Sequence, residues 1–502
     1  MGGARLFDRG RRELFFFVVL AFLLVLVRCF PAAWYEQLDF DSDQAIVGLM
    51  AKHLAEGRTF PLFFYGQHYM LGVQSWLAAP LFLVGGPTLL MLRTPLAIIN
   101  GAVGILLLVL LVRHTGLRPA MAFAASLPLV APSPLVSTLL MQTLGATVEP
   151  ILYVLLLWVL RRRPVIFGLV LAIGFLHREF TIFAIPALVL VMAGEGTLFT
   201  RATVERLVTV LLVAAAVWIV VDQLKARVDV YGPTTGHPEN ASLSVEMQAI
   251  LQRVCLQPQK LLASARSMFM DCLPDLYGGR TFPLEYYGVN SRLSAGSSTL
   301  GWLLVAAGTL MTVRLAVLLR HARFGDLTFP AYLALVGIQA IVVYPLACEI
   351  IPGLPGIVRY VFPALLIPVA LGAAFLKYET RAALRMAALG GLLIWGGANL
   401  AGTLRLINEY RIAPPENKSK DFADYLVASG VKYGRASYWD AYVLDFFSRE
   451  QTIIGSEGKF RIKDYENQVN LNRPAASRIV RGPCTGIQGI QYSAWCIVPP
   501  PP

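Results

Sequence analysis

Long apolar segments recur along most of the chain and are separated by short polar stretches. Eleven can be drawn, at residues 14–30, 88–112, 117–132, 147–160, 165–177, 180–194, 207–222, 299–319, 328–346, 358–376 and 384–407. A helix needs ~20 mostly apolar residues to cross a bilayer, and several of these segments are somewhat shorter. The pattern predicts an all-α polytopic membrane protein with about eleven transmembrane helices.

Basic residues lie in the short loops between the apolar segments and indicate how the chain is oriented. If the N-terminus is cytoplasmic, the inward loops carry Arg113, His114, Arg118, Arg161, Arg162, Arg163, Arg201, Arg206, Arg320, His321, Arg323, Lys377, Arg381 and Arg385. An excess of Lys and Arg in cytoplasmic loops is the usual orientation signal of multi-pass proteins. We therefore expect location in the cell membrane (inner or plasma membrane), with a cytoplasmic N-terminus and an extracytoplasmic C-terminus.

The composition supports a membrane protein and argues against other classes. Of the 502 residues, 56% are hydrophobic and only 15% are charged, whereas soluble domains carry about a quarter charged residues. A soluble fold is therefore excluded. The net charge of +12 belongs mostly to the short loops, where it sets the topology. We expect membrane lipids, and no nucleic acid, as partners.

The polar segments divide the chain into two domains. Residues 1–407 form a transmembrane domain with two long outer loops, 31–87 and 223–298, and residues 408–502 form a more polar extracytoplasmic tail. Within the tail, 420–428 has helical spacing, whereas 435–444 and 451–456 resemble strands, with Gly434 and Gly455 as breaks. A small α/β C-terminal domain is therefore expected.

Most of the cysteines fall on the outer side of this topology. They are Cys255, Cys272, Cys348, Cys484 and Cys496. Disulfides persist in extracytoplasmic compartments. Cys484 with Cys496, and Cys255 with Cys272, are the two candidate pairs, and free buried thiols are the alternative because sequence does not fix connectivity.

The first outer loop contains the segment DSDQAIVGLMAKHL at 41–54, whose apolar residues follow a helical period. The residues on its apolar face are Ile46, Leu49, Met50 and Leu54, and those off it are Lys52, His53 and Glu56. This predicts an amphipathic helix over 43–56 that lies along the membrane surface.

Two acidic residues, Asp41 and Asp43, stand at the start of that helix. Asp43 could simply cap the helix, since an Asp at the N-cap accepts bonds from unpaired amides. A carboxylate at the membrane surface could instead accept a proton from an incoming nucleophile. The Asp-Ser-Asp pair also has a form that can hold a divalent metal, but we expect no cofactor.

Together with later segments, this loop resembles the GT-C superfamily of transferases that use polyprenyl-phosphate sugars. The resemblance rests on the acidic pair before a surface helix and on the Tyr-Gly-Gln turn in FPLFFYGQHYMLGVQSWLAAPLF (60–82). It also rests on the Arg-Tyr-x-x-Pro motif in GLPGIVRYVFPALLIP (353–368). The bacterial members include aminoarabinose transferases and relatives of protein O-mannosyltransferases. Many members have Asp-Glu where this chain has Asp43-Gln44, and Lys-Pro-Pro is absent after 66–69. These differences argue against an aminoarabinose transferase proper.

The resemblance implies an inverting glycosyltransferase. It makes Asp43 the general base, with Asp41 as second choice, and the donor a sugar on a polyprenyl phosphate. The enzyme must then deprotonate the acceptor, align it opposite the phosphate and neutralise that phosphate. The acceptor, a lipid, a glycan or a protein, is left open, as is the sugar. By the same resemblance, Tyr65, Gln67 and His68 of the Tyr-Gly-Gln turn contact substrate.

Cations for the donor phosphate are expected at the outer boundary of the membrane. The candidates are Arg359 with its neighbour Tyr360, Arg178 and His177. Interface anchoring is the alternative for Arg359, and a snorkelling surface turn with Glu179 is the alternative for Arg178. Glu149, at the outer end of the fourth segment, could orient the acceptor or the base, but an ordinary interfacial carboxylate is the favoured interpretation.

A polytopic transporter or lipid flippase is the main alternative class. Such proteins tend to have internally repeated halves and polar groups near the midplane of the membrane. This chain has no recognisable internal repeat, and its distinctive acidic residues lie in outer loops. The sequence therefore favours the transferase.

Overall fold

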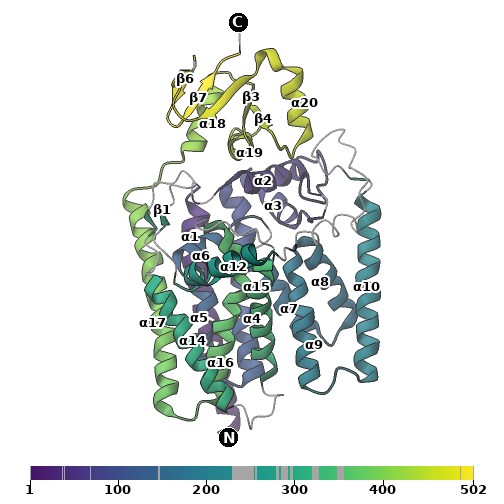
Figure 1. Cartoon of the computed structure of the whole chain (residues 1–502), viewed down its shortest axis with the longest axis vertical. Coiled ribbons are helices and arrows are strands. Elements are labelled where there is room, and N and C mark those ends of the chain that lie inside the picture. Colours follow the sequence, from purple (N-terminus) through teal and green to yellow (C-terminus); the bar gives the residue numbers. More distant parts are fainter. Residues whose placement is uncertain are drawn as a thin grey trace.

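A long helical bundle carries a small mixed domain at one end (Figure 1). The N-terminus lies at the far end of the bundle, and the C-terminus lies in the small domain. The computed structural model describes residues 2–225, 227–228, 254, 257–278, 282–283, 292–293, 298–318, 327–346, 355–486 and 488–500, without 37, 39, 68, 145 and 146.

Each of the predicted apolar segments falls on a helix. The helices are α1 (Gly2–Trp34), α4 (Leu89–Thr115), α5 (Pro119–Val130), α7 (Glu149–Leu160), α8 (Pro164–His177), η1 (Glu179–Phe183) continued by α9 (Ala184–Gly194), α10 (Arg201–Lys225), α14 (Ser298–Leu318), α15 (Thr328–Leu346), η6 (Pro355–Leu365) continued by α16 (Leu366–Tyr378), and α17 (Ala382–Ile412). Shorter elements among them are α6 (Pro134–Leu139), α12 (Pro258–Ser267), η2 (Met268–Cys272), α13 (Leu273–Tyr277) and the strands β1 (Phe282–Pro283) and β2 (Arg292–Leu293).

Six of these helices are, by length and composition, long and apolar enough to cross a membrane. Within the described residues they are Gly10–Trp34, Leu89–Thr115, Arg201–Lys225, Thr328–Leu346, Val358–Tyr378 and Ala382–Ile412. The others are apolar but shorter, so the number of crossings stays a prediction. The chain is a multi-pass, mainly helical membrane protein.

The bundle is apolar outside and closely packed inside, as a lipid environment requires. On α10, Leu211 and Leu212 are each about two-thirds exposed, which suits a helix that faces lipid. Between α1 and α4, a Cβ on Gly101 would lie 2.8 Å from the Phe22 ring, so the glycine lets the two helices approach. Buried Arg28 donates to Asn100 Oδ1 at 2.7 Å. This hydrogen bond gives the charged side chain a polar partner inside the bundle, because a charge that faces lipid is unfavourable.

The first outer loop forms two helices, α2 (Ser42–Ala55) and α3 (Val73–Gly85), where one was predicted. They pack on each other between the bundle and the small domain (Figure 1). The predicted helix at 43–56 is present as α2, and its position along the membrane surface stays a prediction. Lys52 and His53, which lie off its apolar face, are buried because the C-terminal domain covers them.

The C-terminal segment is a small α/β domain, as predicted. Its elements are α18 (Lys418–Ala428), β3 (Tyr433–Ser437), α19 (Tyr438–Phe447), β4 (Ile453–Glu457), α20 (Lys463–Leu471), η7 (Arg473–Ala475), β5 (Ser477–Arg481), β6 (Ile490–Tyr492) and β7 (Trp495–Val498). The sheet order is β4-β3-β5-β7-β6. Strand β3 runs parallel to β4 and β5, whereas β7 runs antiparallel to β5 and β6.

The predicted strand at 435–444 is wrong beyond Ser437, because α19 begins there. This helix is buried on two sides. Ala441 and Leu444 pack into the domain core, while Tyr442 and Phe446 join the cluster that contains α2. An apolar run covered on two faces loses its helical period, so it cannot be told from a strand by sequence.

The two glycines expected to break strands lie inside them instead. A Cβ on Gly434 would lie 2.9 Å from Ile454 Cδ1 of the neighbouring strand, and one on Gly455 would lie 3.2 Å from a Glu466 carboxylate oxygen. These positions need glycine because other groups pack against the backbone there.

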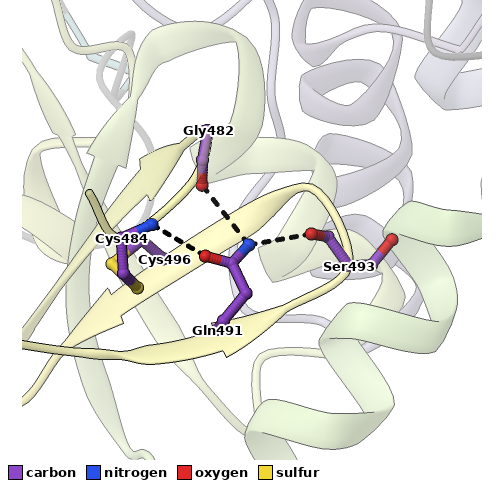
Figure 2. Close-up of a disulfide and its surroundings, with 5 residues drawn as sticks. All are labelled: Gly482, Cys484, Gln491, Ser493 and Cys496. Carbon is purple, nitrogen blue, oxygen red and sulfur yellow. Dashed lines mark hydrogen bonds between the residues drawn. A yellow bond between two sulfur atoms is a disulfide. The ribbon is translucent and has the colours of Figure 1, made fainter.

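Cys484 and Cys496 form a disulfide, as predicted, with their Cα atoms 5.1 Å apart (Figure 2). Beside it, Gln491 accepts from Cys484 N at 2.8 Å and donates to Ser493 O at 2.8 Å. The bridge and the glutamine together tie the last loop to the β6–β7 hairpin. Cys255 lies outside the described residues, so its predicted pairing with Cys272 does too.

Replacing both bridge cysteines by serine (C484S/C496S) should lower the free energy of unfolding of the C-terminal domain by about 2–3 kcal/mol, because the bridge closes a short loop. Denaturant unfolding of the whole protein in detergent measures this. Reductant should cause the same loss in the natural protein and none in the double variant. Alkylation of both thiols in freshly extracted, unreduced protein would contradict the bridge.

Candidate functional site

Asp41, and not Asp43, caps helix α2. Asp41 has an extended backbone, and its side chain accepts a hydrogen bond from Gln44 N at 3.0 Å. The helix therefore starts one residue before the predicted boundary. Capping as the role of Asp43 is wrong, and its carboxylate in the first turn is available for another purpose.

The Asp43 carboxylate meets the C-terminal domain. Its Oδ1 accepts a hydrogen bond from the Tyr438 hydroxyl at the start of α19. Burial and the nearby Asp43 charge raise the pKa of Tyr438 well above its ordinary value, so the phenol stays protonated and remains a donor. Arg461 donates in turn to the Tyr438 oxygen at 3.3 Å.

Arg461 joins the Tyr-Gly-Gln turn to this group. It is buried, donates to Gly66 O at 2.7 Å, and lies over the Phe64 ring at 5.6 Å. Gly66 has a φ of +68°, and a Cβ there would lie 2.9 Å from Arg461 Cδ. Both the backbone conformation and the space therefore require glycine.

The predicted residues of the Tyr-Gly-Gln turn have different surroundings. Tyr65 is fully buried, with its hydroxyl 3.1 Å from His53 Nδ1 on α2. Gln67 is half-buried, and its backbone N–H donates to Phe64 O at 2.9 Å. His68 lies outside the described residues.

Arg359 lies close enough to Asp41 and Asp43 for both carboxylates to act on its charge. Its Nη2 donates to Tyr360 OH at 3.3 Å, and its guanidinium lies over the Tyr360 ring at 5.1 Å. Tyr360 stacks on Tyr344 at 5.7 Å between ring centroids. The fold thus brings the predicted cation to the predicted base.

Arg178, Glu149 and His177 gather in a second group. The Arg178 guanidinium donates to Leu144 O. Buried Glu149 accepts from the amide and hydroxyl of Thr147 at 3.3 and 3.2 Å, and from Gln74. These bonds hold the segment before α7 in place.

Two features connect this second group to α2. Gln44, the residue that stands where many GT-C members have Glu, accepts from Thr143 N at 3.2 Å. A small cavity also lies between α2 and α8, and its lining includes Val47, one turn after Asp43, and His177. His177 Nδ1 is held 3.0 Å from Tyr153 OH.

Glu450 anchors the C-terminal domain on α2, and sequence reasoning missed it. Its carboxylate, 8% exposed, binds Lys52, His53 Nε2 at 3.0 Å, and Arg58 at 2.7 and 3.0 Å. Tyr465 OH donates to it at 2.7 Å. We call these five residues the Glu450 cluster.

Protonation states in the Glu450 cluster follow from its surroundings. Burial alone would raise the pKa of Glu450, but hydrogen bonds and charges from His53, Arg58 and Lys52 hold it well below its ordinary range. Burial lowers the pKa of His53 despite the neighbouring carboxylate. The backbone of Glu450 is left-handed, with a φ of +63°, a conformation uncommon outside glycine.

No metal cluster is evident in the part of the chain that the structure describes, where no three His, Cys, Asp or Glu side chains gather. The positively charged Arg359 guanidinium lies near Asp41 and Asp43. Of the residues that complete this site, Tyr438 begins α19 and Glu450 follows the end of that helix, but nothing in their spacing indicates contact with α2. Arg461 gives no such signal either.

Comparison by sequence finds no matching family model and no matching curated protein. By structure, the chain shares its fold with ArnT over almost its whole length. This agrees with the predicted mainly helical membrane fold with a small C-terminal domain. The chain superposes on a crystal structure of ArnT from Cupriavidus metallidurans bound to undecaprenyl phosphate, with a TM-score of 0.58 and 13% identity over 96% of this chain and 97% of that one. The apo structure of the same ArnT gives a TM-score of 0.43 and 12% identity.

The Glu450 cluster should make the protein sensitive to acid. The lowered pKa of Glu450 stabilises the fold fully above the ordinary value of 4.5, and this contribution is lost as the pH falls below 4.5. The lowered pKa of His53 stabilises the fold above about pH 6.5, and this contribution is lost as the pH falls below that value. The free energy of unfolding of the natural protein should therefore decrease below about pH 6.5 through His53, and further below pH 4.5 through Glu450.

Glu450→Gln should remove about 3 kcal/mol at pH 7, because it leaves buried basic groups without their counter-charge. It should also remove the further loss of stability below pH 4.5, and keep the loss that His53 causes below about pH 6.5. The control is Glu457→Gln, which breaks an exposed pair with Arg478 and should change stability by less than about 1 kcal/mol. Equal stability of the two variants at pH 7 would rule out the anchoring role.

Proposed function

We propose that the protein is an inverting glycosyltransferase that moves a sugar from a polyprenyl-phosphate donor to an acceptor on the extracytoplasmic side of the membrane. The observation that carries this proposal is the meeting of Asp43, free from capping, with Arg359. The fold supports it, and so does the undecaprenyl phosphate in the ArnT structure. The basic inward loops support a cytoplasmic N-terminus and a site at the outer surface.

The reaction needs a base and a cation at opposite ends of one displacement. The acceptor oxygen bonds to the anomeric carbon as its proton passes to Asp43. The bond from that carbon to the phosphate oxygen breaks, and its electron pair leaves with the lipid phosphate. Arg359 offsets the charge on that phosphate. Attack from the face opposite the phosphate inverts the anomeric centre.

The other predicted residues have supporting places in this proposal. Tyr360 stacks under the Arg359 guanidinium and orients it. His177 lines the small cavity beside α2. Tyr65, Arg178 and Glu149 act by holding the segments around the site.

Asp43→Asn should lower sugar transfer by ~10²-fold or more, because the amide keeps the shape of the side chain but loses its basicity. Thermal stability and donor binding should barely change, since Asp41 supplies the cap. Transfer rates, melting temperature and donor affinity measured together give this result.

Near-normal transfer by Asp43→Asn would remove Asp43 as the base. Asp41→Asn then decides the matter. Asn caps about as well as Asp, so a large loss of transfer without a loss of stability would assign the base to Asp41.

Arg359→Ala should weaken donor binding by roughly tenfold or more, the scale of a lost hydrogen bond to a charged group. Arg359→Lys should weaken it less, because the lysine keeps a charge but not the planar fork. Titration of the purified protein with undecaprenyl phosphate measures both. Unchanged affinity in Arg359→Ala would move the phosphate-binding role to Arg178.

A further inference from the structure

Helix α19 presents two tyrosines, one turn apart, that are used differently. The Tyr442 hydroxyl stays within its own domain and accepts from the amides of Arg461 and Ile462 at 2.6 and 3.4 Å. The Tyr438 hydroxyl leaves the domain and binds Asp43. Burial raises the pKa of both phenols, so the difference lies in their partners.

The direction of the hydrogen bonds at Tyr438 is determined by chemistry. A guanidinium has only donors, so the Tyr438 oxygen must accept from Arg461. The single hydroxyl proton of Tyr438 is then available for the Asp43 carboxylate. Arg461 cannot turn away easily, because Gly66 O and the Phe64 ring hold it. The result is a one-way chain from Arg461 through Tyr438 to Asp43.

Four charged or titratable groups of the described residues surround the Asp43 carboxylate. Asp41 is the N-cap of the helix that carries Asp43, and Arg359 comes from η6. Tyr438 and, behind it, Arg461 come from the C-terminal domain. Tyr438 makes a direct hydrogen bond to Asp43.

We propose that Tyr438 is a positioning residue of the transfer site, so that the C-terminal domain completes that site. This rests on the proposed function of Asp43 as the base. Tyr438 holds the carboxylate by Oδ1, which leaves Oδ2 to accept the proton of the acceptor hydroxyl. A carboxylate held at one oxygen keeps a single orientation toward the reacting atoms, and small errors in such geometry are expensive in rate.

Losing this hydrogen bond in Tyr438→Phe should shift the infrared carboxylate bands of Asp43, because Oδ1 loses its donor. Infrared spectra of the whole purified protein show these bands without any substrate when the spectrum of Asp43→Asn is subtracted. The matched control is Tyr442→Phe, which removes a phenol from the same helix and should leave the bands unchanged.

Turnover gives the second measurement, with undecaprenyl-phosphate-linked sugars as donors in membranes that contain the acceptor. Tyr438→Phe should lower kcat by about tenfold or more and leave the affinity for undecaprenyl phosphate unchanged. Replacing Tyr438 by 3-fluorotyrosine keeps the shape and strengthens the donor. It should shift the Asp43 carboxylate bands in the direction opposite to the shift in Tyr438→Phe.

A Tyr438→Phe variant with the same Asp43 carboxylate bands and the same kcat as Tyr442→Phe would overturn the positioning role. If 3-fluorotyrosine leaves the Asp43 bands in place, the role is excluded even where Tyr438→Phe folds poorly. The proposed function fails in a different way, by full turnover in Asp43→Asn. The infrared measurement needs no turnover, so the two failures can be told apart.

Discussion

The docking of the C-terminal domain on helix α2 is the interaction on which the rest of the site depends. A carboxylate as buried as that of Glu450 is stable only among counter-charges and donors, and α2 and its following turn supply three of them. The same docking carries Tyr438 to Asp43 and Arg461 to the Tyr-Gly-Gln turn. Moving the domain away would leave Glu450 and His53 without each other and Asp43 without its hydrogen bond.

Other contacts fix α2 from the membrane side. Arg93, buried in α4, donates to Ala32 O at 2.6 Å and to Leu38 O at 2.7 Å, which holds the chain as it approaches the helix. Gln44 binds the segment before α7. On the outer side, a Cβ on Gly48 would lie 2.5 Å from the Phe446 ring, so α2 and α19 are as close as glycine allows. A carboxylate on so constrained a helix has little freedom to lose before reaction.

The helical bundle faces lipid and the C-terminal domain is polar, and the proposed site lies at the boundary between them. In the bundle, charges such as Arg28 are paired inward and apolar side chains such as Leu211 face outward. At the end of the bundle that carries the C-terminal domain, Arg359 lies near Asp41 and Asp43, beneath a polar domain. In the proposed function, the lipid phosphate and the acceptor would meet at this boundary.

Local patterns decided what could be predicted from the sequence. Apolar length placed the helices of the bundle, helical spacing placed α18, and the short separation of Cys484 and Cys496 favoured their pairing, because each depends on neighbours along the chain. The acidic residues, Arg359 and the superfamily resemblance came from short motifs of the same kind. These determined the fold class and the residue types of the site.

Contacts between distant segments needed the tertiary structure. Tyr438 lies 395 positions from Asp43, and Glu450 lies 397 from His53, so no spacing rule connects them. The helix α19 resembled a strand because two different surfaces cover it, and a one-residue shift in the start of α2 decided which aspartate is the cap. Periodicity and capping preference depend on the nearest few residues. Which carboxylate is left free, and what holds it, depends on how separate segments pack, which those few residues do not encode.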